Sequence, residues 1–277
     1  MTKIGYYLCL VTGGSIITDF IKVPPSYFSY KYNILNMFFA KWGWGWTLIP
    51  LTLFVIISSY VYNAGSKTHI RGHLMRILFG SVCWYVSTNT FREIERLTGY
   101  CSSLSNNKAV VTESRKLYLN QNSCRKNGGT WIGFDISGHC FLMVLCNLWI
   151  MEELKVLLHW KTLGSLISSQ NDEEVEGIAN LSGKELKFIQ TNYNKYSNLL
   201  RWIFCFLACL SVLWDIILLT TVLYYHTMPT KLIGTLVAIA CHFLCYKTLF
   251  PLAKCGDFFG LFPGLPGDGK VNFIVKR

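Results

Sequence analysis

The feature that most limits the fold of this chain is the recurrence of long segments without a charged side chain. The longest covers residues 42–66, and it exceeds the roughly 18 residues that by themselves indicate a transmembrane helix. Shorter uncharged runs cover residues 4–18, 77–91, 136–151, 202–214, 216–230 and 232–246. Only 15% of the 277 residues are charged, against roughly 25% in soluble domains. This composition excludes a soluble enzyme and indicates an integral membrane protein.

We expect an all-α, polytopic membrane protein with six transmembrane helices. Lysine and arginine side chains extend from helix ends to the headgroups, so a span can be longer than its uncharged run. The expected spans are residues 4–21, 42–63, 74–91, 136–158, 201–225 and 232–253. They form one membrane domain over residues 1–254, with a long loop over 92–131, a polar linker over 160–200 and a tail over 255–277.

An even number of spans places both termini on one side of the membrane. That side would hold fifteen of the 26 lysines and arginines and the other side eleven, which favours cytosolic termini under the positive-inside rule. Loop 92–131 is then lumenal, where Cys101 and Cys124 are expected to form a disulfide; two free thiols are the alternative if the loop is cytosolic. The linker and the tail are expected on the cytosolic side.

Two of the six histidines are expected to emerge at the same, lumenal membrane face. His139 follows Ser137 and Gly138 at the start of the fourth span, and a helix N-terminus there favours anions. It can act as a general acid toward a bound phosphate. His226 ends the fifth span near Lys231 and can attack phosphorus as a neutral imidazole. From spacing alone, interfacial histidines that only hydrogen-bond nearby loops are the favoured alternative.

Other polar residues indicate less specific chemistry. Asp215 lies inside the fifth span, where a carboxylate is costly, and is expected to pair with a basic residue of another span. His69 and His73 have the i, i+4 spacing of a metal pair, but no third ligand accompanies them. We therefore expect no metal and no other cofactor. The basic residues follow the membrane ends and form no nucleic-acid-binding motif, so no nucleic acid is expected as a partner.

Several short motifs, in the same order along the chain, resemble those of one family of membrane proteins. They are residues 24–29 (PPSYFS), 33–36 (NILN), 44–47 (WGWT), 98–101 (TGYC), 134–142 (FDISGHCFL), 225–226 (YH) and 231–236 (KLIGTL). Together they resemble the fat-storage-inducing transmembrane family, endoplasmic reticulum proteins linked to lipid droplet formation.

The family is similar to the lipid phosphate phosphatase superfamily, which implies roles for both histidines. In that superfamily a Ser-Gly-His element supplies the acid for the leaving group and a later histidine is the nucleophile, which correspond to His139 and His226. The superfamily has an arginine and an aspartate at the positions of Thr220 and Thr230. Because both are absent, the residues that neutralise the phosphates are open. The candidates for substrate contacts are Ser137, Gly138, Lys231, Arg92 and Arg96.

The resemblance implies an enzyme of the endoplasmic reticulum membrane with a lumenal active site. Its substrate would be fatty acyl-CoA, whose diphosphate is cleaved to acyl 4'-phosphopantetheine and adenosine 3',5'-bisphosphate. The alternative is a non-catalytic protein that binds diacylglycerol or triacylglycerol and partitions neutral lipid into droplets. The missing superfamily arginine and aspartate favour that alternative. A lipid phosphate monoesterase is a third hypothesis.

Overall fold

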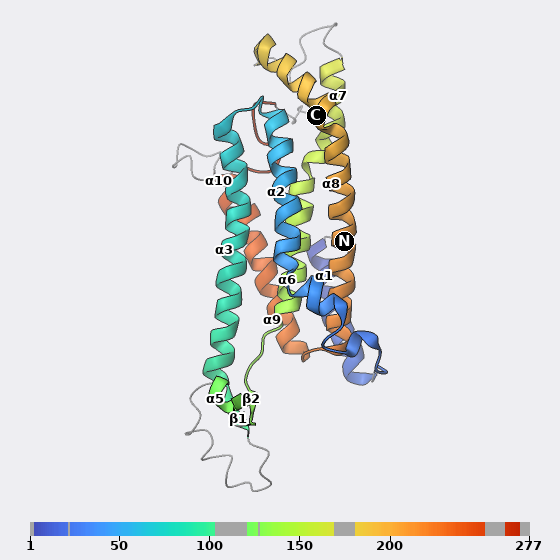
Figure 1. Ribbon diagram of the computed structural model, residues 1–277, viewed down its shortest axis with the longest axis vertical. Helices are drawn as coiled ribbons and strands as arrows, with labels where there is room; N and C mark the ends of the chain where they lie inside the picture. The colour runs from blue at the N-terminus through green and yellow to red at the C-terminus, as the bar shows by residue number, and fades with distance from the viewer. Residues whose placement is uncertain are drawn as a thin grey trace.

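The computed structural model describes residues 3–21, 23–102, 121–126, 128–168, 181–252 and 264–271, and it is a bundle of long helices with a small two-stranded sheet at one end (Figure 1). Much of the expected loop (103–120) and the acidic part of the linker (169–180) lie outside the described residues, as does the expected tail apart from 264–271.

A helix lies at each of the six expected spans, so the predicted all-α class is confirmed. The main helices are α1 (Lys3–Phe20), α2 (Gly43–Tyr62), α3 (Lys67–Thr98), α6 (Gly138–Leu154), α7 (Val156–Ser168), α8 (Gly183–Tyr224) and α9 (Met228–His242), which continues into η3 (Phe243–Leu249) and α10 (Phe250–Leu252). The smaller elements are η1 (Tyr27–Ser29), η2 (Leu35–Ala40), α5 (Gln121–Lys126), β1 (Tyr100–Ser102) and β2 (Thr130–Ile132). Within the expected linker, residues 160–168 and 183–200 are helical and belong to α7 and α8.

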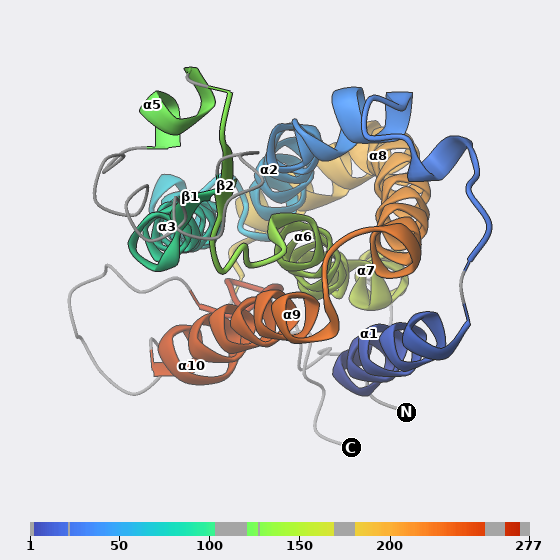
Figure 2. The ribbon, with the colours of Figure 1, turned by 90° about the horizontal axis from the view of Figure 1, so that it is seen from below.

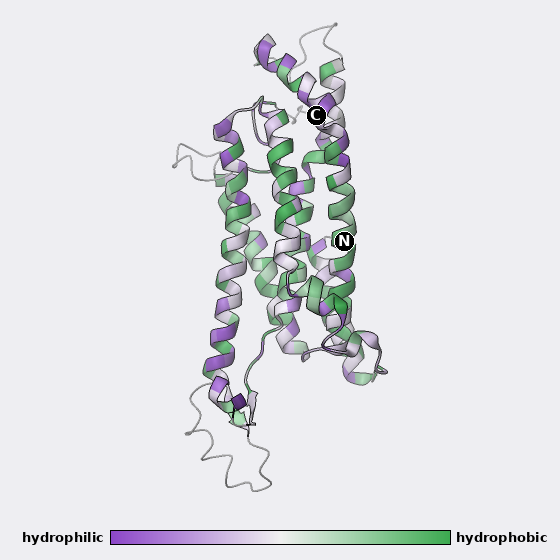
Figure 3. Ribbon diagram, viewed as in Figure 1, coloured by the Kyte–Doolittle hydropathy of each residue, from purple (hydrophilic) through white to green (hydrophobic). Residues whose placement is uncertain are grey.

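Three helical segments in the described ranges are long and apolar enough to cross a membrane. They are Gly43–Tyr62, Gly183–Tyr224 and Met228–Leu252. Figure 3 shows hydrophobic residues concentrated along the middle of the bundle and hydrophilic ones toward its two ends. The chain is therefore a membrane protein of helical class, whereas the count of six spans stays a prediction.

Helix α6 lies at the centre of the bundle. Figure 2 shows it surrounded by α2, α8 and α9. Twelve of its 17 residues are buried, and its central part, residues 140–150, is buried on every side. A helix that is apolar all round packs against other helices in this way. Its N-terminus is held by α9, because Ser137 N donates to Thr230 O (3.2 Å) and Gly234 lies directly against Ser137 O.

The half-buried carboxylate of Asp215 pairs with neutral donors. Its Oδ1 accepts hydrogen bonds from the Tyr7 hydroxyl (3.1 Å) and from Asn147 Nδ2 (2.7 Å). In the described part of the chain Asp215 forms no ion pair with the expected basic partner, although the charge of Lys3 on α1 acts on it. The two neutral donors satisfy the carboxylate directly, without the desolvation of a second charge. Asp215 therefore ties α8 to α1 and α6.

A buried ion pair fixes the end of the bundle where α6 finishes. Arg76 of α3 donates to both oxygens of Glu153 of α6 (2.7 and 2.8 Å). The Tyr246 hydroxyl also donates to Glu153 (2.7 Å), and Arg76 Nη1 donates to Gly264 O (2.8 Å). Through this last contact, residues 264–271 of the expected tail pack onto the bundle.

The sheet at the other end of the bundle carries a disulfide. Strands β1 and β2 are antiparallel, with Cys101 opposite Trp131. Cys101 is joined to Cys124 of α5, and Gly129 is in close contact with both sulfur atoms. Figure 1 shows this substructure at the end of the bundle where α6 begins.

Candidate active site

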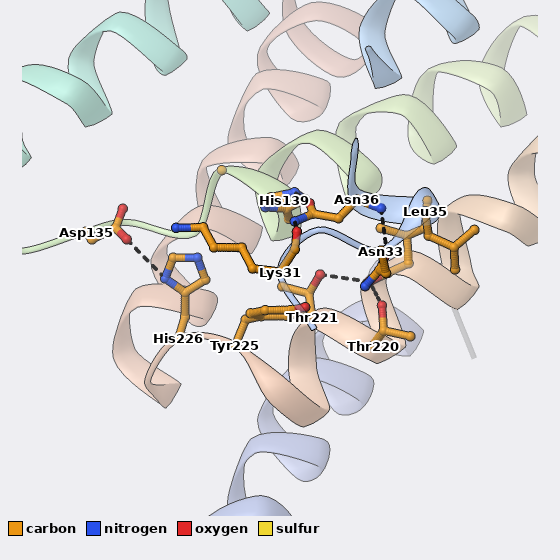
Figure 4. Close-up of a pocket in the computed structure, with 12 residues that line it drawn as sticks. Lys31, Asn33, Leu35, Asn36, Asp135, His139, Thr220, Thr221, Tyr225 and His226 are labelled. Atoms are coloured by element: carbon orange, nitrogen blue, oxygen red, sulfur yellow. Dashed lines mark hydrogen bonds and ion pairs between the residues drawn. The ribbon is translucent and has the colours of Figure 1, made fainter. Parts of the chain in front are cut away.

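A cavity of about 480 Å³ lies at the end of the bundle where α6 begins and α8 ends. Its volume is within the range of small-molecule sites, about 300 to 1,000 Å³. Both predicted catalytic residues, His139 and His226, line it, although 87 positions separate them in the sequence (Figure 4). The lining residues are Lys31, Asn33, Leu35, Asn36, Asp135, Gly138, His139, Ile217, Thr220, Thr221, Tyr225 and His226.

His139 is placed on the first turn of α6 by a helix cap. The Ser137 hydroxyl accepts a hydrogen bond from Cys140 N (3.3 Å), which caps the helix. The imidazole Nε2 lies 2.7 Å from Asn36 Oδ1, while Asn36 Nδ2 donates to Lys31 O (2.6 Å). Because the amide nitrogen is committed to a carbonyl, the amide oxygen faces the histidine. Nε2 of His139 therefore carries the hydrogen in this arrangement.

His226 lies in the short connection between α8 and α9 with an uncommon backbone conformation. Its φ is 59°, in the left-handed region that residues other than glycine seldom adopt. Such backbone strain persists where the surrounding structure enforces it, and it is frequent at functional sites. Nδ1 of the ring lies 3.5 Å from the Asp135 carboxylate, so Nε2 is left for a substrate.

Burial lowers the pKa of His226 below its ordinary value. The carboxylate of Asp135 acts in the opposite direction, whereas the positive charges of Lys231 and Lys31 add to the lowering of the pKa. A lowered pKa keeps the imidazole neutral near pH 7, which is the form that can attack an electrophile.

The connection that contains His226 is fastened to the segment between α1 and α2. The Tyr225 hydroxyl donates to Phe28 O (2.8 Å), and Ser26 Oγ donates to the Tyr224 hydroxyl (2.9 Å). These hydrogen bonds join the residues directly before His226 to the 3₁₀ turn η1. The chain from η1 to η2 therefore forms one wall of the cavity.

The five predicted substrate-binding residues are not gathered in one place. Gly138 lines the cavity, and Ser137 is buried behind it as the helix cap. The Lys231 ammonium is buried and donates to Val222 O (2.8 Å). Arg92 and Arg96 lie on the last turns of α3, where Arg96 pairs with Glu93 (2.8 Å). None of these three cations is among the described residues that line the cavity.

Sequence reasoning missed three polar residues of the cavity. Asp135 and Asn36 entered only as members of the motifs at 134–142 and 33–36, and Lys31 did not enter at all. Residues 33–36 and 134–142 both belong to the motifs noted in the sequence, and that co-occurrence was the signal that was available. In the described ranges, no three His, Cys, Asp or Glu side chains are grouped to hold a metal ion.

Comparison with known proteins places these features in a family. The family model of the fat storage-inducing transmembrane protein matches residues 24–246. The acyl-coenzyme A diphosphatase FITM2 of Drosophila melanogaster is 31% identical over 98% of this chain, which spans 62% of that relative's length. Proteins of the same name from Xenopus laevis and Homo sapiens are 32% and 30% identical over 86% and 91% of this chain, which covers 78% and 81% of their lengths. No solved structure matches this chain.

Proposed function

Because this chain belongs to the fat storage-inducing transmembrane family, we propose that it is a fatty acyl-CoA diphosphatase. Water would cleave the diphosphate of acyl-CoA to give acyl 4'-phosphopantetheine and adenosine 3',5'-bisphosphate. The observation that carries the proposal is the convergence of His139 and His226 on one cavity. The names of the relatives support the substrate class.

In the first step, Nε2 of His226 attacks one phosphorus of the diphosphate. The N–P bond forms as the bond from phosphorus to the bridging oxygen breaks, which leaves a phosphohistidine. The Asp135 carboxylate, 3.5 Å from Nδ1, holds the ring and stabilises the positive charge that develops on it. The negative charges of the bound diphosphate favour the protonated form of His139, which gives its proton to the departing oxygen, so that a phosphate monoester leaves.

In the second step, water attacks the phosphohistidine. His139, now neutral, takes the proton of the water, and the N–P bond breaks to regenerate His226. The N-terminus of α6 adds partial positive charge on the Gly138 side of the cavity, where it favours the phosphate oxygens. The cycle consumes one water for each diphosphate cleaved.

The proposal includes a location and a topology. We place the chain in the endoplasmic reticulum membrane as a single six-span domain over residues 1–254, with cytosolic termini and a lumenal active site. The disulfide of Cys101 and Cys124 supports this orientation, because it lies at the same end of the bundle as the cavity and disulfides persist in an oxidising lumen. Cleavage of acyl-CoA there would support lipid droplet formation and lipid homeostasis.

Product analysis of the purified full-length protein tests the function. We expect acyl-CoA to yield adenosine 3',5'-bisphosphate and acyl 4'-phosphopantetheine in equal amounts. His226→Ala should abolish both the products and an acid-labile phosphoenzyme, while His139→Ala should slow turnover by ~10² to 10⁴. His69→Ala, an exposed histidine on the first turn of α3, is the matched control and should keep the parental rate.

The same experiment separates the enzyme from its alternative. If the parental protein binds diacylglycerol or triacylglycerol but releases no nucleotide from acyl-CoA, the non-catalytic lipid-binding hypothesis replaces the enzyme. Release of inorganic phosphate from a lipid phosphate, without cleavage of acyl-CoA, would instead indicate the monoesterase.

A further inference from the structure

Among the described residues that line the cavity, one is a lysine or arginine. Lys31 is that residue, and the remaining lining residues include no arginine and no other lysine. A diphosphate that reacts in such a site brings several negative charges, which need a positive partner in the transition state. Lys31 can be that partner if its backbone is fixed and its ammonium faces the reacting phosphorus.

The backbone around Lys31 is held by hydrogen bonds that begin beside His139. Asn36 donates from Nδ2 to Lys31 O (2.6 Å) and offers its Oδ1 to His139 Nε2 (2.7 Å). Asn33, which is buried, donates to Phe28 O (3.2 Å) and Tyr30 O (2.8 Å) on the preceding turn. Lys31 thus lies on a segment that is held by hydrogen bonds, and the amide of Asn36 links its backbone to His139, the proposed acid.

The side chain of Lys31 extends along the cavity, and its ammonium group is not engaged in an ion pair with a described residue. Figure 4 shows its ammonium end on the side of the cavity that holds His226 and Asp135. Its positive charge acts on His226, where it contributes to the lowered pKa. In the described part of the chain the ammonium has no ion-pair partner, in contrast to Arg96, which is paired with Glu93.

From these observations we propose that Lys31 binds the diphosphate of the substrate and neutralises the oxygens of the phosphorus that His226 attacks. This role rests on the proposed acyl-CoA diphosphatase function. The positive charge that the phosphates require would then come from the segment between α1 and α2. Lys231 cannot take that role in this arrangement, since its ammonium is already bonded to Val222 O.

Inhibition by inorganic diphosphate and steady-state kinetics with acyl-CoA test the proposal in the full-length protein. Lys31→Met should weaken diphosphate inhibition about 10- to 100-fold, which corresponds to the loss of a charge-assisted hydrogen bond, and should lower kcat/KM at least as much. Lys31→Arg keeps the charge and should retain most of both. Lys41→Met removes an exposed lysine of the same inter-helix segment that does not line the cavity, and it should match the parent.

Direct calorimetric binding of inorganic diphosphate separates this role from the proposed function. If the parent does not cleave acyl-CoA but binds diphosphate, and Lys31→Met loses that binding, the role of Lys31 stands and the function fails. If the parent cleaves acyl-CoA while Lys31→Met keeps parental diphosphate binding and parental kcat/KM, the role of Lys31 is overturned. Absence of diphosphate binding by the parent overturns it as well.

Discussion

The carboxylate of Asp135 lies 3.5 Å from Nδ1 of His226, although 91 positions separate the two residues in the sequence. Asp135 belongs to the segment that enters α6, and His226 to the connection that leaves α8. The lipid phosphate phosphatase superfamily has an aspartate four positions after its nucleophile, where this chain has Thr230. The acid partner of His226 therefore comes from another part of the chain. The pairing leaves Nε2 of His226 toward the substrate.

Asp135→Asn is expected to lower kcat on the order of 10². The amide keeps the shape of the side chain but loses the charge that stabilises the imidazolium formed on attack. Because the carboxylate raises the pKa of His226, its removal should also move the acid limb of the kcat/KM profile to lower pH. Glu93→Gln, which neutralises an exposed carboxylate of the surface pair on α3, is the control. An unchanged kcat and an unchanged limb in Asp135→Asn would show that the pair has no role in the reaction.

The parental enzyme is expected to stay active below the ordinary pKa of histidine. Burial lowers the pKa of His226, so the ring remains neutral as the pH falls through about 6.5, and protonation stops the attack only at lower pH. The acid limb of kcat/KM should therefore have its midpoint below about 6.5. The measurement is initial rate against pH with acyl-CoA in excess of detergent-solubilised protein. A midpoint above 6.5 would contradict the burial of a neutral nucleophile.

The presence of the helices was predictable from the sequence because the apolar runs are long. The full length of each helix was not predictable in this way. Helix α8 begins at Gly183, 18 positions before the expected span, because a charged segment continues it. Ser182 and Glu185 form a capping box at its start, a sequence signal for a helix N-terminus that was available. Helix α3 (Lys67–Thr98) likewise extends beyond the uncharged run 77–91 in both directions, through segments that contain charged residues. Hydropathy therefore identifies the apolar middle of each helix but not the residues at which the helix begins and ends.

The site was predictable only in part, for a physical reason. Strict alternation of spans brought the start of one helix and the end of another to the same face, which is how His139 and His226 were paired in the prediction. Lys31 and Asn36 come from the connection between α1 and α2, whose path depends on tertiary hydrogen bonds such as Tyr225 to Phe28 O. Neither spacing nor composition encodes that path.

Asp215→Asn is expected to leave the parental kcat unchanged. Both hydrogen bonds to Asp215, from Tyr7 and from Asn147, go to the same oxygen, which an asparagine also supplies. The residue is not among those that line the cavity. Asp215→Ala removes the acceptor and leaves two donors without their partner, at a cost of about 1 to 3 kcal/mol in stability. Thermal unfolding and kcat of both variants are the measurements, and a loss of kcat in folded Asp215→Asn would give the carboxylate a catalytic role.

Gly234→Ala is expected to lower both stability and activity, because α9 approaches the start of α6 at this position. A Cβ at Gly234 would lie 2.5 Å from Ser137 O, a backbone atom that cannot move without α6. The overpacking should cost roughly 1 to 3 kcal/mol and displace the first turn of α6, which carries His139. Gly72→Ala on α3 is the matched control, since a Cβ there meets no atom within 4 Å and alanine favours the helix. Melting temperature and kcat should fall together in Gly234→Ala and not in Gly72→Ala. If Gly234→Ala instead melts and turns over like the parent, the close contact of α9 with α6 does not position the catalytic turn.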